Sequence, residues 1–129
     1  MAIAVSEAGR TVNLAAAFAG FDEPWAPRLA GRVNDCAVKL AKFRGDFDWH
    51  SHADEDEMFL VIKGAMRMAF RDRIEIVEAG EFVIVPRGVE HRPGSEGDEC
   101  HVLLFEPATT LNTGDGEPTA RTVAKLEDL

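Results

Sequence analysis

The sequence predicts a single all-β domain, and three observations support that class. The chain has 129 residues, 46% of them hydrophobic, which is enough for one core but too few for a second domain. Glycine and proline punctuate the middle of the chain and leave segments of about five to eight residues, the length of strands rather than helices. Eight such segments follow one another at a spacing typical of a sandwich or a barrel.

The predicted elements start with a short helix and continue as strands. Asn13 precedes an alanine-rich segment, and its side chain is expected to cap one or two helical turns. The first two strands form a hairpin around a turn at Asn34-Asp35, and further turns are expected at Lys63-Gly64 and Arg71-Asp72. The predicted strands cover residues 28–33, 36–43, 47–52, 57–62, 65–70, 74–77, 81–85 and 100–105.

Two of the predicted strands are apolar on both faces, and their outer side needs a cover. In residues 57–62 and 100–105, apolar side chains occupy consecutive positions, so an isolated barrel wall would leave one set in water. The candidates for the cover are the N-terminal arm, residues 1–27, and a second copy of the chain, and we favour the homodimer. With the barrel domain at 28–108, residues 109–129 are expected to form a tail that lies on the barrel or on a partner.

Charge and composition exclude several function classes. The formal net charge is -9 and no Lys/Arg cluster is present, so neither nucleic acid nor an anionic membrane surface is expected as a partner. The longest apolar run, residues 58–62, is too short to cross a bilayer, and the N-terminal segment lacks the features of a signal peptide. We therefore expect a cytoplasmic protein whose two cysteines, Cys36 and Cys100, are reduced, with a disulfide as the alternative.

A cluster of histidines and carboxylates points to a metal site. His50 and His52 are two residues apart, so on an extended chain their side chains point to the same face. Glu57 follows a short loop and can bring its carboxylate to that face, with Glu55 as the competing acid. His91 follows a tight turn after a predicted strand and is the candidate for a third imidazole. Three imidazoles and one carboxylate suit a divalent first-row transition metal better than magnesium or calcium.

The spacing of these residues resembles the two motifs of the cupin superfamily. The first motif is matched by Gly45, His50, His52, Glu57 and Gly64, with one residue fewer than usual after the first glycine. The second motif is matched in spacing by Gly80, Pro86, Gly88 and His91, whereas Ser95 stands where the family often has Asn. Glu57 fits better than Glu55 because only Glu57 keeps the six-residue spacing to Gly64.

The resemblance implies a fold and a ligand set. The fold is the cupin double-stranded β-helix, a jelly-roll barrel, and the implied metal ligands are His50, His52, Glu57 and His91. The metal stays open among iron, manganese, nickel, copper and zinc, because this ligand set accommodates each of them. His101 lies outside both motifs and is expected to be a lining or surface residue rather than a ligand.

Three functions are considered for a site of this kind. The first is a metalloenzyme, an oxygenase or an isomerase/lyase, that acts on a small oxygenated organic molecule between apolar walls. The side chains expected to form those walls are Phe43, Phe47, Phe59 and Phe82. The second is a non-catalytic protein that binds or senses a small ligand, as some superfamily members do. The third, a sugar-phosphate isomerase, is disfavoured because only Lys63, Arg87 and Arg92 lie near the motifs to receive a phosphate.

Overall fold

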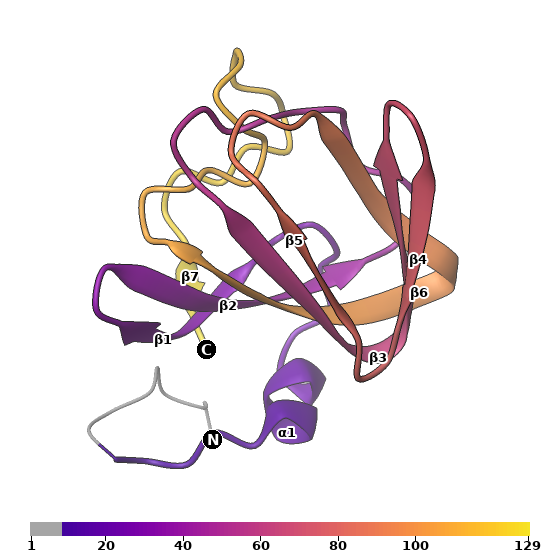
Figure 1. Cartoon of the computed structure of the whole chain (residues 1–129). Helices are drawn as coiled ribbons and strands as arrows, with labels where there is room; N and C mark the ends of the chain where they lie inside the picture. Colours follow the sequence, from indigo (N-terminus) through magenta and orange to yellow (C-terminus); the bar gives the residue numbers. More distant parts are fainter. Residues whose placement is uncertain (1–8) are drawn as a thin grey trace.

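In the computed structural model, which describes residues 9–129, one short helix precedes seven strands. The elements are α1 (Leu14–Ala19), β1 (Arg28–Val33), β2 (Cys36–Phe43), β3 (Glu57–Phe70), β4 (Ile74–Glu78), β5 (Phe82–Val85), β6 (His91–Pro107) and β7 (Glu127–Asp128). All seven described strands belong to one sheet in the order β4-β3-β6-β2-β1-β7, with β5 paired to β3. The sheet curls round on itself (Figure 1), and the prediction of an all-β barrel is confirmed.

The two longest strands hold the barrel together. β3 pairs antiparallel with β6 on one edge, and its other edge carries β5 on the first half and β4 on the second. The second half of β6 also pairs with β2, which forms the predicted hairpin with β1. Because β3 and β6 have neighbours on both edges, their inward side chains supply most of the buried apolar cluster inside the barrel.

The predicted turn at Lys63-Gly64 is wrong, because β3 continues through it. Gly64 has a φ of 76°, and the pairing register with β6 shifts on both sides of Lys63. This bulge changes which positions point inward, from odd-numbered ones such as Phe59 to even-numbered ones such as Met66. The predicted strands 57–62 and 65–70 are therefore two halves of one bulged strand.

Residues 47–52, predicted as a strand, form an extended segment without regular pairing. In the described chain only isolated bridges, among them His50↔His91, join this region to β6. Phe47 donates its N–H to the Pro93 carbonyl at 2.8 Å, but Pro93 has no N–H with which to return the bond. The ladder is therefore interrupted, and the segment is held at separate points beside the start of β6.

The remaining strand predictions need smaller corrections. β1, β2, β4 and β5 lie within one residue of their predicted bounds. The strand predicted at 100–105 is the second half of β6, which begins at His91 because Gly94 and Gly97 lie within the strand instead of ending it. The sequence does not predict β7, two residues that pair parallel with β1 and bring Glu127 within 2.9 Å of the Arg28 guanidinium.

The N-terminal arm covers part of the outer face of the barrel. Asn13 caps α1 as predicted, since its side chain accepts a backbone N–H at 2.9 Å. Phe18 of α1 is buried in one cluster with Leu40 of β2, and Leu129 at the end of the chain packs against the same cluster (Figure 1). Residues 1–8 of the predicted arm lie outside the described residues. Among residues 9–129, no helix has the length and apolar character needed to span a membrane.

Both cysteines are free thiols, as predicted. Cys100 is buried in the barrel interior, and Cys36 is half-buried at the start of β2. Burial raises the pKa of the Cys100 thiol to about 12, so this thiol stays protonated and unreactive at neutral pH.

Substitution of Gly64 tests the bulge in β3. A Cβ at this position would lie 2.7 Å from the Glu99 carbonyl oxygen, on a backbone that side chains rarely adopt. We expect Gly64→Ala to lower the free energy of unfolding by about 2–5 kcal/mol. Gly80→Ala is the matched control, because Gly80 has a φ of 87° with nothing within 4 Å of the added Cβ, and it should cost about 1–2 kcal/mol. Urea denaturation of both variants measures the difference, and equal losses would contradict the close approach.

Candidate metal centre

Four of the predicted site residues converge inside the barrel. The group consists of His50, His52, Glu57 and His91. Each offers one ligand atom, and the four atoms lie within 4.8 Å of one another. The first two come from the extended segment before β3, whereas Glu57 and His91 are the first residues of β3 and β6. The group is enclosed, because every member is at most 3% exposed except His50, which is half-buried.

Backbone bonds place His50 against His91. Each residue donates its N–H to the carbonyl of the other, at 3.0 and 2.9 Å. Nδ1 of each ring also lies 2.9 Å from the carbonyl oxygen two residues earlier, that of Asp48 for His50 and that of Val89 for His91. Because a carbonyl only accepts, Nδ1 carries the proton, and Nε2 of each neutral ring presents a lone pair.

Glu57 lies between two ring nitrogens of the group. Its Oε1 is 3.0 Å from Nε2 of His52 and 3.0 Å from Nε2 of His91. These three buried atoms have no hydrogen-bond partner within residues 9–129. The Nε2 lone pair of His91 faces the carboxylate oxygen at this distance and repels it, and a buried polar group left unsatisfied costs about 1–3 kcal/mol. One cation among them would satisfy all three atoms, so the donor set fits a divalent metal.

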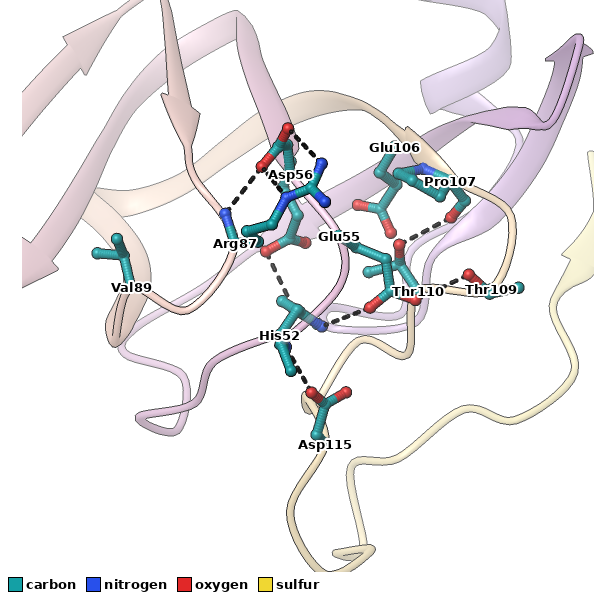
Figure 2. Close-up of polar contacts among 12 residues, drawn as sticks. His52, Glu55, Asp56, Arg87, Val89, Glu106, Pro107, Thr109, Thr110 and Asp115 are labelled. Atoms are coloured by element: carbon teal, nitrogen blue, oxygen red, sulfur yellow. Dashed lines mark hydrogen bonds and ion pairs between the residues drawn. The ribbon is translucent and has the colours of Figure 1, made fainter.

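Glu55, the competing acid, lies on the other side of the His52 ring. Its Oε1 is 3.8 Å from Nδ1 of His52, and its Oε2 accepts a hydrogen bond from Thr109 Oγ1 at 2.7 Å. Figure 2 shows Glu55 between the His52 ring and Thr109, with Asp115 on the neighbouring loop. The structure therefore brings Glu57 to the three-histidine group, whereas Glu55 lies near the opposite side of the His52 ring without a hydrogen bond to it.

Burial and neighbouring charges shift the ionisation of the group. Burial and the neighbouring His91 lower the pKa of His50 to about 4, so this ring is neutral at pH 7. Burial acts to raise the pKa of Glu57, but the His52 and His91 rings outweigh it and hold this pKa well below its usual range. Burial acts to lower the pKa of His52, whereas the Glu57 carboxylate raises it above the usual value. A neutral His50 and an ionised Glu57 are the forms that bind a metal.

The group opens onto a cavity of about 240 Å³, whose wall includes His50 and Glu57. Three of the four predicted lining residues are present: Phe43, Phe47 and Phe59. Trp25, from the N-terminal arm, stacks on two of these rings with centroid distances of 4.5 and 4.6 Å. The cavity is therefore largely aromatic and apolar, with the polar group on one side.

The structure also shows where the side chains of Phe82, His101 and Ser95 point. Phe82 does not line the cavity, because alternation along β5 turns it outward and leaves it 60% exposed. His101 also lies on the outer face, where its ring stacks on Phe18 at a centroid distance of 4.7 Å. Ser95 replaces the usual Asn and still makes a bracing contact, since its Oγ accepts the Gly45 N–H at 2.9 Å. That bond ties the two motifs together.

Sequence reasoning misses a buried ion pair in the cavity wall. Lys39 Nζ lies 2.9 Å from Oε2 of Glu106 and 3.0 Å from the Thr110 carbonyl oxygen. Burial and the neighbouring Glu57 raise the pKa of Glu106 to about 8, although Lys39 opposes the shift. Alternation along the strands gives a signal for these two residues. Lys39 is at an inward position of β2, and Glu106 is at an inward position of β6. The predicted strand 100–105 ends one residue before Glu106.

The segment that follows β6 also borders the site. Residues 108–112 line the cavity, and the segment crosses one end of the barrel (Figure 1). Gly114 has a φ of 83°, and a Cβ there would lie 2.6 Å from the Ser51 carbonyl oxygen and 2.9 Å from Cβ of His50. The predicted tail therefore lies on the barrel and packs directly against the backbone that carries the first motif.

Comparison with known proteins gives the family. A family model described as "Cupin domain" matches residues 38–106, a stretch that exceeds half of the chain and contains the whole histidine and glutamate group. The chain belongs to the cupin family. The resemblance inferred from the two motifs is confirmed, and this cupin has a histidine or glutamate at each ligand position of the motifs.

Two solved structures and one curated protein are similar to this chain. A cupin-2 domain containing protein from Shewanella frigidimarina NCIMB 400 is 42% identical, with a TM-score of 0.72 over 74% of this chain and 93% of that chain. NMB1881 from Neisseria meningitidis is 32% identical, with a TM-score of 0.70 over 77% of this chain and 100% of that chain. The uncharacterized protein YdbB of Bacillus subtilis (strain 168) is 41% identical over 64 residues, which are 49% of this cupin and 57% of YdbB.

Histidine substitutions test the metal-binding assignment. We expect His50→Ala and His91→Ala each to abolish stoichiometric binding of a divalent transition metal while the barrel stays folded, because each removes a ligand nitrogen. His101→Ala is the control, since this ring lies on the outer face and should leave metal content unchanged. Elemental analysis of protein purified without chelators, with circular dichroism for the fold, measures the effect. Full metal content in either site variant would rule out the assignment.

Proposed function

We propose that this cupin is a metal-dependent enzyme, an oxygenase or an isomerase/lyase, that acts on a small oxygenated organic molecule. One observation supports this proposal above the others: unpartnered buried nitrogens and a carboxylate oxygen converge at the wall of an apolar cavity. The proposed ligands are His50, His52, Glu57 and His91, and the ion is iron, manganese, nickel, copper or zinc. A metal ion with open coordination positions supplies Lewis acidity and, when it is iron, reactivity towards oxygen.

The protein's own residues position the organic molecule in this proposal. Phe43, Phe47 and Phe59 form apolar walls that exclude water, and water exclusion strengthens every electrostatic interaction in the cavity. The Nδ1 bonds of His50 and His91 to backbone carbonyls hold both rings in one tautomer with Nε2 aimed at the group. The ligand geometry is therefore set before any molecule enters the cavity.

The side chains around the cavity disfavour a sugar-phosphate substrate. The three cationic residues near the motifs, Lys63, Arg87 and Arg92, are not among the described residues that line the cavity. Arg87 instead contacts the exposed Asp56 carboxylate at 3.3 Å (Figure 2). Lys39 does line the cavity, but its ammonium is already paired with the Glu106 carboxylate, so a phosphate dianion would meet fewer cationic donors than such groups require.

We also propose that the chain forms a homodimer through the outer face of β5, β3 and β6. Phe82 and Ile84 are 60% and 53% exposed, and they lie opposite the half-buried Leu60 and Met58 of β3. Phe105 of β6 pairs with Met58 on its other side and extends the surface. We call these five residues the outer patch. It has no charged member and suits contact with its own copy about a two-fold axis.

We further propose a cytoplasmic location and a division into an arm (1–27), a barrel (28–108) and a tail (109–129). Free thiols at Cys36 and Cys100 suit a reducing compartment. The net charge of -9 argues against nucleic acid and anionic membranes as partners. A small molecule and a second copy of the chain are the partners that we propose.

Turnover assays test the proposed activity. Protein reconstituted with each of the five metals is mixed with hydroxy acids, diketones, enediols and catechols, with an oxygen electrode for uptake and NMR under nitrogen for rearrangement. We expect conversion with at least one metal and its loss in Glu57→Gln, which removes a ligand charge while keeping the side-chain shape. His101→Ala is the active control. Tight ligand binding without conversion under either atmosphere would instead identify a non-catalytic binding protein.

Oligomeric state tests the outer patch. We expect light scattering after gel filtration to give twice the mass of one chain, and Ile84→Glu to give a monomer because it buries a charge in the interface. Val33→Glu is the control, since Val33 is 50% exposed and lies away from the patch at the end of β1. A monomeric wild type, or a dimer that survives Ile84→Glu, would contradict the proposed interface.

A further inference from the structure

We infer that the cavity receives a small organic monoanion, a hydroxy acid whose carboxylate is bound by Lys39 and whose hydroxyl hydrogen-bonds to Glu106. The inference rests on the proposed function, because the charge of a bound metal ion is what favours an anionic ligand. The inference specifies the substrate class, which the three histidines and the glutamate do not determine by themselves.

Lys39 and Glu106 form an incomplete polar site in an otherwise apolar wall. An ammonium has three donors, and Lys39 uses one on Glu106 and one on the Thr110 carbonyl. Its third donor has no partner among the residues that the structure describes. Glu106 is 2% exposed, and its Oε1 likewise has no hydrogen-bond partner within residues 9–129. One unused donor and one unused acceptor therefore lie side by side at the cavity.

The formal charges favour an anionic ligand once a divalent ion is bound. The ion and Lys39 bring three positive charges, whereas Glu57 and Glu106 bring two negative ones, which leaves one positive charge in a buried site. With Glu106 protonated, two positive charges remain. An uncompensated buried charge is costly, so an anion is favoured in both states of Glu106. Without the ion the same groups are neutral or negative, and the preference for an anion disappears.

The size and walls of the cavity restrict the rest of the ligand. A cavity of about 240 Å³ is smaller than the roughly 300–1,000 Å³ of typical ligand sites, which favours a small acid over a nucleotide or an oligosaccharide. Trp25, Phe43 and Phe47 form a continuous aromatic stack on the wall, which suits an apolar body.

A hydroxyl on the carbon beside the carboxylate matches the two unused groups. The Lys39 ammonium and the Glu106 carboxylate are in contact at 2.9 Å, so adjacent oxygens of one ligand reach both. The ligand carboxylate accepts from Lys39, and the ligand hydroxyl hydrogen-bonds to Oε1 of Glu106, as donor when Glu106 is ionised and as acceptor when it is protonated. A simple carboxylate would leave Oε1 unsatisfied, and a simple alcohol would leave the charge uncompensated.

Calorimetric titration with matched probes tests the ligand class. The probes are glycolate, lactate and mandelate, each paired with its uncharged amide, added to zinc-loaded protein so that no redox turnover occurs. We expect at least one acid to bind about 10- to 100-fold more tightly than its amide, and the preference to vanish in metal-free protein. Equal affinities for acid and amide throughout the series, or no binding of any acid, would overturn the inference.

Lysine substitutions test the proposed anchor. Lys39→Met should weaken binding of the preferred acid about 10- to 100-fold without loss of zinc. Lys42→Met is the matched control, because Lys42 is also buried on β2 but faces outward and donates to the Phe21 carbonyl at 2.5 Å. If Lys39→Met alone unfolds, the double variant Lys39→Met/Glu106→Gln removes the pair together and should show the same loss. Unchanged acid affinity in a folded Lys39 variant would overturn the inference.

Zinc content separates this inference from the proposed function. Failure of the wild-type protein to bind zinc or any other divalent transition metal would refute the metal centre, and with it the charge balance used here. Normal zinc binding without a preference for the acid would refute only the ligand class and leave the metal centre in place.

Discussion

The Glu57 carboxylate is buried and lies 3.0 Å from ring nitrogens of His52 and His91, and none of the residues that the structure describes makes a hydrogen bond to any of these three atoms. Such an arrangement is unfavourable by itself, and much of the fold supports it. β3 supplies Glu57 and β6 supplies His91, while reciprocal backbone bonds hold His50 beside the start of β6. A cation at the centre of the group would satisfy all three atoms, and this is how the fold supports the proposed metal chemistry.

A chain of polar contacts extends from this centre towards the end of the sequence. Glu57 adjoins Glu106, Glu106 pairs with Lys39, and Lys39 donates to the Thr110 carbonyl. The C-terminal segment is therefore connected to the site through hydrogen bonds as well as through the close packing of Gly114 on His50. A metal ion in the histidine and glutamate group and an anion in the cavity would both interact with the Lys39–Glu106 pair. We therefore expect the binding of one to change the affinity for the other.

The sequence predicts the candidate site better than it predicts the strands. Spacing alone brings His50 and His52 together, because extended backbone places alternate side chains on one face even where regular pairing fails. The continuation of β3 through Gly64 is not predictable from a local pattern, because glycine serves equally in a turn and in a bulge. The contact between Glu106 and Lys39 also depends on the pairing of distant strands, so alternation along each strand can predict only that both side chains point inward. The prediction that Phe82 lines the cavity is wrong because the neighbouring residues of β5 are apolar at consecutive positions. The sequence pattern then does not indicate which face of the strand points inward.

The bulge at Gly64 explains how one strand serves both ends of the barrel. Before it, the inward residues of β3 include Glu57 and Phe59 at the site; after it, Met66 and Met68 point inward and are completely buried. Without the added residue, the second half would turn those methionines to the outside. The apolar half fills one end of the interior, so the cavity lies towards the other end, where residues 108–112 form its wall. Residues 108–112 therefore share the wall of the cavity with His50 and Glu57, although they lie far from both in the sequence.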